Sequence, residues 1–210
     1  MTPIFVTGIG TGIGKTIVSA ILTEALQADY WKPVQAGFEE GTDALLVTSL
    51  LTNNITVVHP EIYKLKLPAS PHIAARQEGI RIDLDFINQH KPVTLNKNLV
   101  IEGAGGLMVP LNEKEFVIDL VKKLNAKVIL VSRNYLGSIN HSLLTARVCK
   151  QNEIDVIGWV FNDRYMQYEE EIAAWSGYQK IFSLPAAGKV DKAFVLQQAE
   201  RVKSSLAGLI

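Results

Sequence analysis

A glycine-rich segment near the start of the chain holds the residues with the clearest chemistry. Residues 8–16 read GIGTGIGKT, so that Lys15 and Thr16 directly follow Gly14. Closely spaced glycines let a chain curl until successive backbone N–H groups face one anion, and a helix beginning near Lys15 would add its positive end. Lys15 could then reach the β- and γ-phosphates of a nucleotide, and the Thr16 hydroxyl could bind Mg²⁺. These residues predict a phosphate-binding loop.

The spacing of this loop differs from the common patterns. The phosphate-loop pattern G-x-x-x-x-G-K-[ST] needs a glycine where the chain has Ile9, and counted from Gly8 the loop is one residue longer. The dinucleotide pattern G-x-G-x-x-G also fails, because its last glycine would fall on Ile13, Lys15 or Ile17. A plain glycine-rich turn would explain the glycines but not a lysine followed by a hydroxyl residue, so we favour phosphate binding.

Two carboxylates are candidate ligands for Mg²⁺, which takes oxygen ligands. Glu102 ends the apolar residues 99–101 and precedes the glycine-rich residues 103–106. A charge there is costly unless it faces a cation or solvent, and the glycines let the backbone approach a ligand, so we favour a metal ligand over a solvated strand end. Asp43 follows Thr42 at the start of an expected helix, where a metal-ligand role and a helix-capping role are equally supported.

Three further polar residues follow apolar segments. Lys32 could be a second cation that faces a phosphoryl group, or an ordinary surface lysine. Asn162 and Asp163 could hydrogen-bond the edge of a purine, or form a simple Asx turn.

These residues fall at the ends of apolar segments that alternate with segments of helical periodicity. We expect strands at residues 4–7, 30–34, 99–102, 127–131 and 156–161, and helices at residues 15–28, 42–51, 116–124, 138–151 and 190–206. The alternation predicts a single-domain α/β fold, with a mostly parallel sheet, helices on both of its faces and a ligand at the carboxyl ends of the strands. Residues 53–97 are the least regular part and predict loops with short helices, which either cover the site or form a surface excursion.

The length and charge of the chain limit the kinds of partner. The 210 residues fit one domain, residues 1–210. Lys+Arg and Asp+Glu both number 21, and zero net charge argues against nucleic acid and against an anionic membrane surface as partners. No apolar segment approaches the roughly 20 residues of a membrane-spanning helix, and the first residues lack the basic region of a signal peptide. We expect a cytoplasmic protein that acts on small molecules.

The motifs together resemble the dethiobiotin synthetase family over nearly the whole chain. The elongated loop that ends in Gly14, Lys15 and Thr16 is similar to the family's own variant of the phosphate loop. Six other segments are similar to family motifs in order and spacing: KPVQAG at residues 32–37, TDA at 42–44, SPH at 70–72, EGAGG at 102–106, LGSINH at 136–141 and GWVFND at 158–163.

This resemblance implies a P-loop NTPase-like fold and an ATP-dependent enzyme of biotin synthesis. The implied reaction is the Mg²⁺-dependent carboxylation and ring closure of 7,8-diaminopelargonic acid with CO₂, which gives dethiobiotin, ADP and phosphate through a carbamate and a carbamic-phosphoric anhydride. The implied metal ligands are Thr16, Asp43 and Glu102, and the implied catalytic residues are Lys32, Lys15 and Thr11.

The resemblance also implies the residues that bind ATP and the diamine. ATP would be bound by Gly12, Ile13, Gly14, Lys15, Thr16, Ile17, Asp43, Glu102, Gly103, Ala104, Gly105, Asn162, Asp163, Pro185, Ala186 and Ala187. The diamine would be bound by Lys32 and Ala36 and, across the interface of a homodimer, by Leu136, Gly137, Ser138, Ile139 and Asn140. Gly12 replaces a glutamate that the family often has, and Ala36 replaces its usual serine or threonine.

Two other classes of protein remain as alternatives. A nucleotide-switch ATPase of the partitioning and septum-positioning kind shares the expected fold, but it usually carries an additional lysine early in its phosphate loop, and residues 8–11 contain none. A non-catalytic interaction module would leave Lys15, Asp43 and Glu102 as coincidences. Dependence of ATP hydrolysis on a diamine and bicarbonate would distinguish the synthetase from both.

Overall fold

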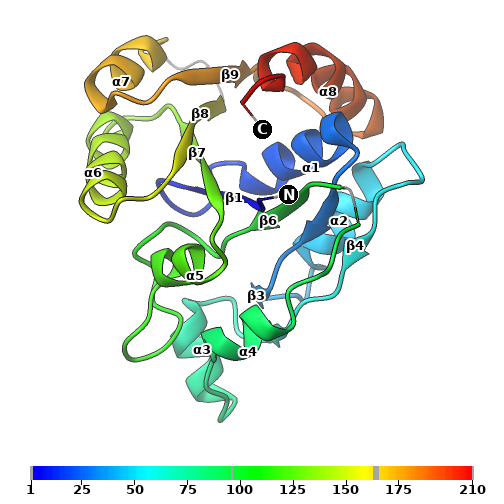
Figure 1. The fold of residues 1–210 in the computed structure, drawn as a ribbon, viewed down its shortest axis with the longest axis vertical. Coiled ribbons are helices and arrows are strands. Elements are labelled where there is room, and N and C mark those ends of the chain that lie inside the picture. The colour runs from blue at the N-terminus through cyan, green and yellow to red at the C-terminus, as the bar shows by residue number, and fades with distance from the viewer. Residues whose placement is uncertain (1, 96, 163–165, 210) are drawn as a thin grey trace.

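A parallel sheet forms the centre of the molecule. In the computed structural model, which describes residues 2–95, 97–162 and 166–209, the main sheet of the described residues has seven strands in the order β4-β2-β6-β1-β7-β8-β9 (Figure 1). The strands are β1 (Ile4–Gly8), β2 (Asp29–Trp31), β4 (Val58–His59), β6 (Leu99–Glu102), β7 (Lys127–Arg133), β8 (Val156–Asn162) and β9 (Lys180–Leu184). Every neighbouring pair in it is parallel, so the loops after the strands lie along one edge.

Helices cover both faces of this sheet, as the sequence predicts. Along β1 the side chains of Ile4 and Val6 pack on one face, whereas Phe5 packs on the other. The first face carries α1 (Lys15–Leu26), α2 (Asp43–Leu50) and α8 (Lys192–Leu206). The second carries α5 (Val117–Lys123), α6 (Ser138–Gln151) and α7 (Glu169–Ser176). The two buried apolar clusters confirm the predicted α/β architecture.

The expected strand at residues 30–34 is wrong as a single element. β2 ends at Trp31, and β3 (Val34–Ala36) belongs to a second, two-stranded sheet with β5 (Tyr63–Leu65). Pro33 separates the two strands because proline has no N–H to donate to a strand ladder. Its carbonyl accepts hydrogen bonds from the backbone N–H groups of Ile62 and Tyr63 instead. The chain therefore leaves the main sheet at Lys32.

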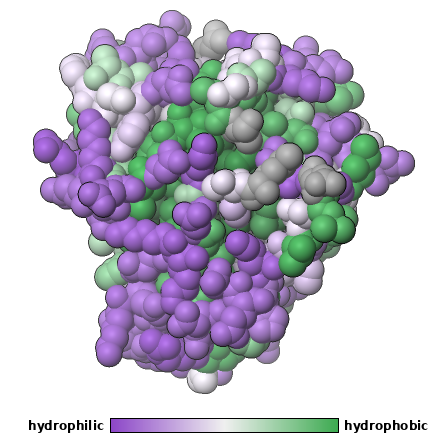
Figure 2. All heavy atoms as spheres, viewed as in Figure 1, coloured by the Kyte–Doolittle hydropathy of each residue, from purple (hydrophilic) through white to green (hydrophobic). Residues whose placement is uncertain are grey.

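The short helices predicted in residues 53–97 are confirmed, but two short strands that were not predicted, β4 and β5, also lie there. The helices are α3 (Pro71–Gln77) and α4 (Leu84–Gln89), which lie in the lower part of Figure 1. The corresponding part of the surface in Figure 2 is mostly hydrophilic, whereas hydrophobic residues gather in the upper half of this face. No helix among the described residues is both long enough and apolar enough to cross a membrane.

Most expected helices and strands match the structure to within one or two residues, but β4, β5, α7 and β9 were not predicted. Helix α6 spans the expected residues 138–151, and α2 spans all but the ends of the expected 42–51. Helix α7 and strand β9 lie in a part of the sequence where no element was expected. β9 forms the edge of the sheet and pairs with β8 alone within the described residues, so contacts distant in sequence determine it.

Candidate active site

The predicted phosphate loop connects β1, in the middle of the sheet, with the first turn of α1. Gly14 precedes this helix with φ of 93° and ψ of 21°, a left-handed conformation that glycine adopts at little cost. A Cβ at Gly14 would lie 1.8 Å from Nδ2 of Asn162. This Nδ2 donates a hydrogen bond to the Ile13 carbonyl at 3.0 Å. Asn162, the last residue of β8, therefore helps to hold the loop in its conformation.

Lys15 bends back over the loop. Its ammonium donates a hydrogen bond to the Gly10 carbonyl at 2.6 Å, and the residue is only 7% exposed. Burial lowers the pKa of Lys15 from its ordinary value of 10.5 to about 8, although the negative charge of Glu102 partly opposes this shift. The lysine is therefore mostly protonated at neutral pH and loses its charge in mildly alkaline solution.

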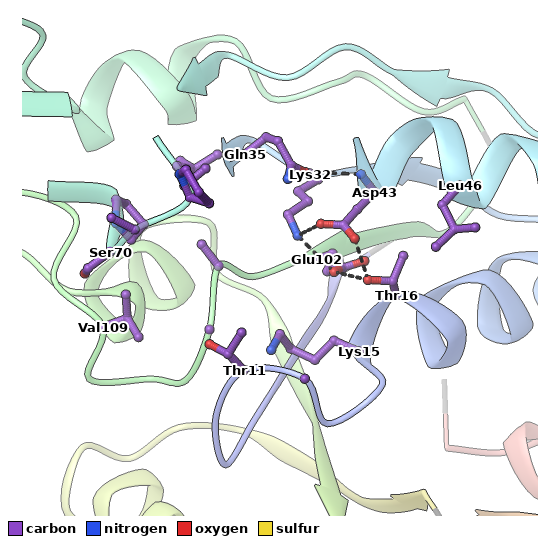
Figure 3. Close-up of a pocket in the computed structure, with 18 of the residues that line it drawn as sticks. Thr11, Lys15, Thr16, Lys32, Gln35, Asp43, Leu46, Ser70, Glu102 and Val109 are labelled. Carbon is purple, nitrogen blue, oxygen red and sulfur yellow. Dashed lines mark hydrogen bonds and ion pairs between the residues drawn. The ribbon is translucent and has the colours of Figure 1, made fainter. Parts of the chain in front are cut away.

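Four side chains from four segments meet beside Lys15, as Figure 3 shows. The Thr16 hydroxyl oxygen lies 2.8 Å from Oδ1 of Asp43 and 2.9 Å from Oε1 of Glu102. The Lys32 ammonium donates hydrogen bonds to Oδ2 of Asp43 and, at 3.0 Å, to Oε1 of Glu102. The first turn of α1, the end of β2, the start of α2 and the end of β6 thus converge at one point.

The charges of Lys32 and Asp43 are stabilised by their oppositely charged neighbours. Burial alone would lower the pKa of Lys32, but the negative charges of Glu102 and Asp43 outweigh burial and raise it above its ordinary value. Burial alone would raise the pKa of Asp43, but Lys32 and the hydrogen bond with Thr16 lower it. Both groups are consequently charged at neutral pH.

Capping of α2 by Thr42 leaves Asp43 free to face the cavity. The Thr42 hydroxyl accepts the hydrogen bond from the Leu45 backbone N–H at 3.2 Å, which satisfies the start of the helix. The Asp43 carboxylate contacts Thr16 and Lys32 instead. Of the two roles that the sequence leaves open for Asp43, the geometry favours a role in the site.

Two residues that hold the carboxylates in place were missed by the sequence analysis. The Tyr30 hydroxyl donates a hydrogen bond to Oε2 of Glu102 at 2.8 Å. Burial and the negative charge of Glu102 raise the pKa of Tyr30 well above its ordinary value, so the hydroxyl keeps its proton. Gln35 accepts a hydrogen bond from the Asp43 backbone N–H at 3.2 Å and donates one to the Gly37 carbonyl at 2.8 Å. Tyr30 lies outside every recognised motif, and Gln35 lies in the motif at residues 32–37 without having been given a role.

A cavity of about 780 Å³ opens above this cluster. The predicted residues Lys15, Lys32 and Glu102 are among those that line it. Figure 3 shows Thr11 next to Lys15. The cavity is lined by Thr11, Gly12, Gly14, Lys15, Thr16, Ile17, Lys32, Val34, Gln35, Ala36, Asp43, Leu46, Pro68, Ala69, Ser70, Pro71, Glu102, Ala104, Gly105 and Val109. Residues 68–71 come from the irregular part of the chain, which therefore does form a wall of the site.

A smaller cavity of about 200 Å³ lies next to the first. Ile17 lines both cavities. The smaller one is also lined by Asn162 and by the predicted residues Pro185, Ala186 and Ala187. Asp163, predicted beside them, lies outside the described residues.

Some predicted site residues do not line the main cavity. The Ile13 side chain is buried in the apolar core, and the Gly103 backbone N–H donates a hydrogen bond to the Val6 carbonyl. Residues 136–140 lie at the start of α6 and line neither cavity, and the Leu136 side chain is 94% exposed. Ile13 and Gly103 could contribute only backbone groups. Contrary to the prediction for Ser138, its side chain is fully buried and its hydroxyl lies 2.7 Å from the Tyr168 hydroxyl, so it does not face a ligand.

The oxygen cluster fits a magnesium ion. The oxygens of Thr16, Asp43 and Glu102 lie within hydrogen-bond distance, but the threonine hydroxyl has one proton to donate to the two carboxylates. Within the described part of the chain no three His, Cys, Asp or Glu side chains gather as a metal-binding group. Two carboxylates, a hydroxyl and the phosphates of a nucleotide are nevertheless the ligands that Mg²⁺ takes in nucleotide-dependent enzymes.

Comparison with solved structures supports the fold alone. The cell division ATPase MinD of Pyrococcus furiosus superposes with a TM-score of 0.60 at 14% identity, covering 97% of this chain and 99% of that chain. The MinC:MinD cell division complex of Aquifex aeolicus gives a TM-score of 0.62 at 13% identity, with 98% and 94% coverage. The predicted P-loop architecture is confirmed, and the switch-ATPase alternative is supported as a relationship of fold only.

Comparison with protein families and curated sequences is more specific. The family model described as "AAA domain" matches residues 2–199. The ATP-dependent dethiobiotin synthetase BioD of Cytophaga hutchinsonii is 49% identical over 203 residues, which cover 96% of this chain and 97% of that protein. The protein of the same name from Christiangramia forsetii is 44% identical over 208 residues, 96% of each chain. With identity this high over nearly its full length, the chain belongs to the ATP-dependent dethiobiotin synthetase family.

Proposed function

We propose that this enzyme carboxylates 7,8-diaminopelargonic acid with CO₂ and closes the ring at the expense of ATP, forming dethiobiotin, ADP and phosphate. One observation carries the proposal beyond family membership. Lys15, Thr16, Lys32, Asp43 and Glu102 converge on one wall of a cavity of about 780 Å³, next to a curled glycine loop. This combination of cations, backbone N–H groups and hard oxygen ligands suits a nucleoside triphosphate.

We place ATP across the two cavities. Its phosphates would lie against residues 12–17 and 102–105, where backbone N–H groups and Lys15 supply positive charge. Its adenine would lie in the smaller cavity, against Asn162 and residues 185–187. Ile17 supports this path because it lines both cavities.

Thr16, Asp43 and Glu102 would hold Mg²⁺. When bound, the ion would neutralise charge on the β- and γ-phosphates and polarise the phosphorus toward attack. The hydrogen bonds from Tyr30 to Glu102 and from the Asp43 backbone N–H to Gln35 would keep the two carboxylates in place.

The rest of the larger cavity would hold the diamine. One amine would add to CO₂, and the resulting carbamate oxygen would attack the γ-phosphorus, releasing ADP and leaving a carbamic-phosphoric anhydride. The second amine would then attack the carbamate carbon, and phosphate would leave as the ring closes. Lys15 and Lys32 would stabilise negative charge on the transferred phosphoryl group. Thr11, which lies next to Lys15, would be the third catalytic residue. Neither lysine would need to act as a nucleophile.

We further infer that the single-domain chain of residues 1–210 works as a homodimer in the cytoplasm. Residues 136–140 line neither cavity of their own subunit, and Leu136 is almost fully exposed. A partner subunit would bring this segment to the diamine.

A ring-closure assay tests the proposal. Purified protein with the diamine, bicarbonate, ATP and Mg²⁺ should form dethiobiotin and release phosphate in equal amounts, and omission of Mg²⁺ or of the diamine should stop both. ATP hydrolysis that needs no diamine and responds to DNA, lipid or another protein would contradict the proposal and support a nucleotide switch.

A further inference from the structure

The carboxylate of Glu102 is held in an unusually enclosed place. Glu102 is only 1% exposed, and a buried carboxylate is stable only if hydrogen bonds and opposite charges replace its water. Its Oε1 faces Thr16 and Lys32, at 2.9 Å and 3.0 Å. Its Oε2 accepts a hydrogen bond from the Tyr30 hydroxyl at 2.8 Å. The two oxygens thus have different partners. Thr16 and Lys32 line the cavity, whereas Tyr30 lies in the apolar core.

Strand register explains why Tyr30 reaches this position. Tyr30 pairs with Val100 in the parallel ladder between β2 and β6. Val100 and Glu102 are two residues apart, so their side chains point to the same face of the sheet as that of Tyr30. The tyrosine ring packs in the apolar cluster on this face, and its hydroxyl reaches past Val100 to Glu102. A phenylalanine would provide the same packing but no proton donor.

The hydrogen bonds from Thr16 and Lys32 both reach Oε1, so Oε2 depends on Tyr30 for its position. The terminal torsion of a glutamate is broad, so packing of the side chain alone does not fix which oxygen faces the cavity. We propose that Tyr30 is a positioning residue, which fixes the Glu102 carboxylate with Oε1 directed at Thr16 and the metal position. This inference rests on the proposed role of Glu102 in holding Mg²⁺.

Substitution Tyr30→Phe tests the inference by direct metal binding. Mn²⁺, which takes the same oxygen ligands as Mg²⁺ and is visible by electron paramagnetic resonance, would be titrated into the ADP complex of the protein freed from excess nucleotide. We expect the dissociation constant for Mn²⁺ to rise by about 10- to 100-fold, the usual effect of losing a partner that orients a metal ligand. Binding of ADP in the presence of EDTA should not change. A Mn²⁺ dissociation constant within twofold of the unsubstituted protein would overturn the inference.

Trp31→Phe is the matched control. Trp31 is the next residue of the same strand, packs on the opposite face, and donates its indole N–H to the Pro60 carbonyl at 3.1 Å. This variant also loses one buried aromatic hydrogen bond, but it should bind Mn²⁺ normally. Equal weakening of Mn²⁺ binding in both variants would mean that Tyr30 acts only through general stability, and would overturn the inference.

Glu102→Gln separates this inference from the proposed function. If Glu102→Gln abolishes Mn²⁺ binding while Tyr30→Phe leaves it unchanged, Tyr30 does not position Glu102, but Glu102 remains a metal ligand. If the Glu102→Gln variant binds Mn²⁺ normally, the proposed metal site is wrong, and the proposed role of Tyr30 is then wrong as well.

Discussion

At the scale of single residues, Lys32 is the side chain whose loss should affect turnover most directly. It contacts both carboxylates of the site and lines the cavity. We predict that Lys32→Gln lowers kcat by about 100-fold or more, because the transferred phosphoryl group loses a buried cation. Steady-state kinetics of ring closure would measure the change.

The control for this variant is another lysine with a carboxylate partner. Lys97 lies 3.2 Å from Oδ1 of Asp29, away from the cavity, so Lys97→Gln should keep normal kcat. Circular dichroism of both variants would confirm that they fold. A kcat of Lys32→Gln within threefold of the unsubstituted enzyme would remove Lys32 from the chemistry.

Lys15 should make nucleotide binding depend on pH. Its pKa of about 8 means that the nucleotide-free protein loses this positive charge as the pH rises through 8, whereas the phosphates of ADP stay negative. The affinity for Mg²⁺-free ADP should therefore be constant below pH 8 and fall by up to about tenfold for each pH unit above it. Isothermal titration calorimetry between pH 6.5 and 9.5 would show this.

Lys15→Arg provides the comparison, because a guanidinium keeps its charge throughout this range. The variant should bind ADP more weakly at pH 7, since its geometry differs, but with little change up to pH 9.5. An equally steep loss of affinity in both proteins would assign the pH dependence to another group.

At the scale of the elements, the turn from β1 into α1 depends on a residue without a side chain at position 14. We predict that Gly14→Ala lowers the free energy of unfolding by about 1–3 kcal/mol, because alanine is strained at φ of 93°. Its Cβ would also displace Asn162. Gly10→Ala is the control, since no atom outside its chain neighbours lies within 4 Å of a Cβ at that position. Chemical denaturation would measure the free energy of unfolding of both variants. An equal decrease in the two would contradict the idea that the turn requires glycine at position 14.

The elements also show what the sequence can predict. Helix α6 and strand β8 were expected nearly as found, because their apolar periodicity is long and local. Strand β9 was missed because five residues at a sheet edge are stabilised by pairing with β8 rather than by their own pattern. The separation of β2 from β3 depends on Pro33, whose effect on a strand interior was underestimated.

The site could be predicted only where a motif marks it. Thr16, Asp43 and Glu102 were identified although they are far apart in the sequence, because each lies in a recognisable segment. Tyr30 lies in no such segment, and Gln35 lies in one without its role being visible there, because the two roles arise from strand register and from the position of α2. A buried tyrosine in a strand carries no sequence signal that separates a hydrogen-bonding role from packing.

At the scale of the whole molecule, the inferred homodimer can be tested through Leu136. We predict that Leu136→Asp shifts the protein from dimer to monomer in sedimentation analysis and raises the KM for the diamine, because an exposed apolar side chain at an interface is replaced by a charge. ADP binding should stay normal, since the segment lines neither nucleotide cavity. Leu95→Asp, at another residue that is 83% exposed, should leave the oligomeric state unchanged. An unsubstituted protein that sediments as a monomer would contradict the inference.

The central place of β1 in the sheet has a consequence for synthesis on the ribosome. β1 precedes both of its neighbours in the chain by many residues, since these are β6 at Leu99–Glu102 and β7 at Lys127–Arg133. The segment that follows β1 therefore has a neighbouring strand on each side only after β7 has been made. A nascent chain arrested before β7 should be unable to retain nucleotide, and this capacity should arise abruptly once that strand has left the exit tunnel.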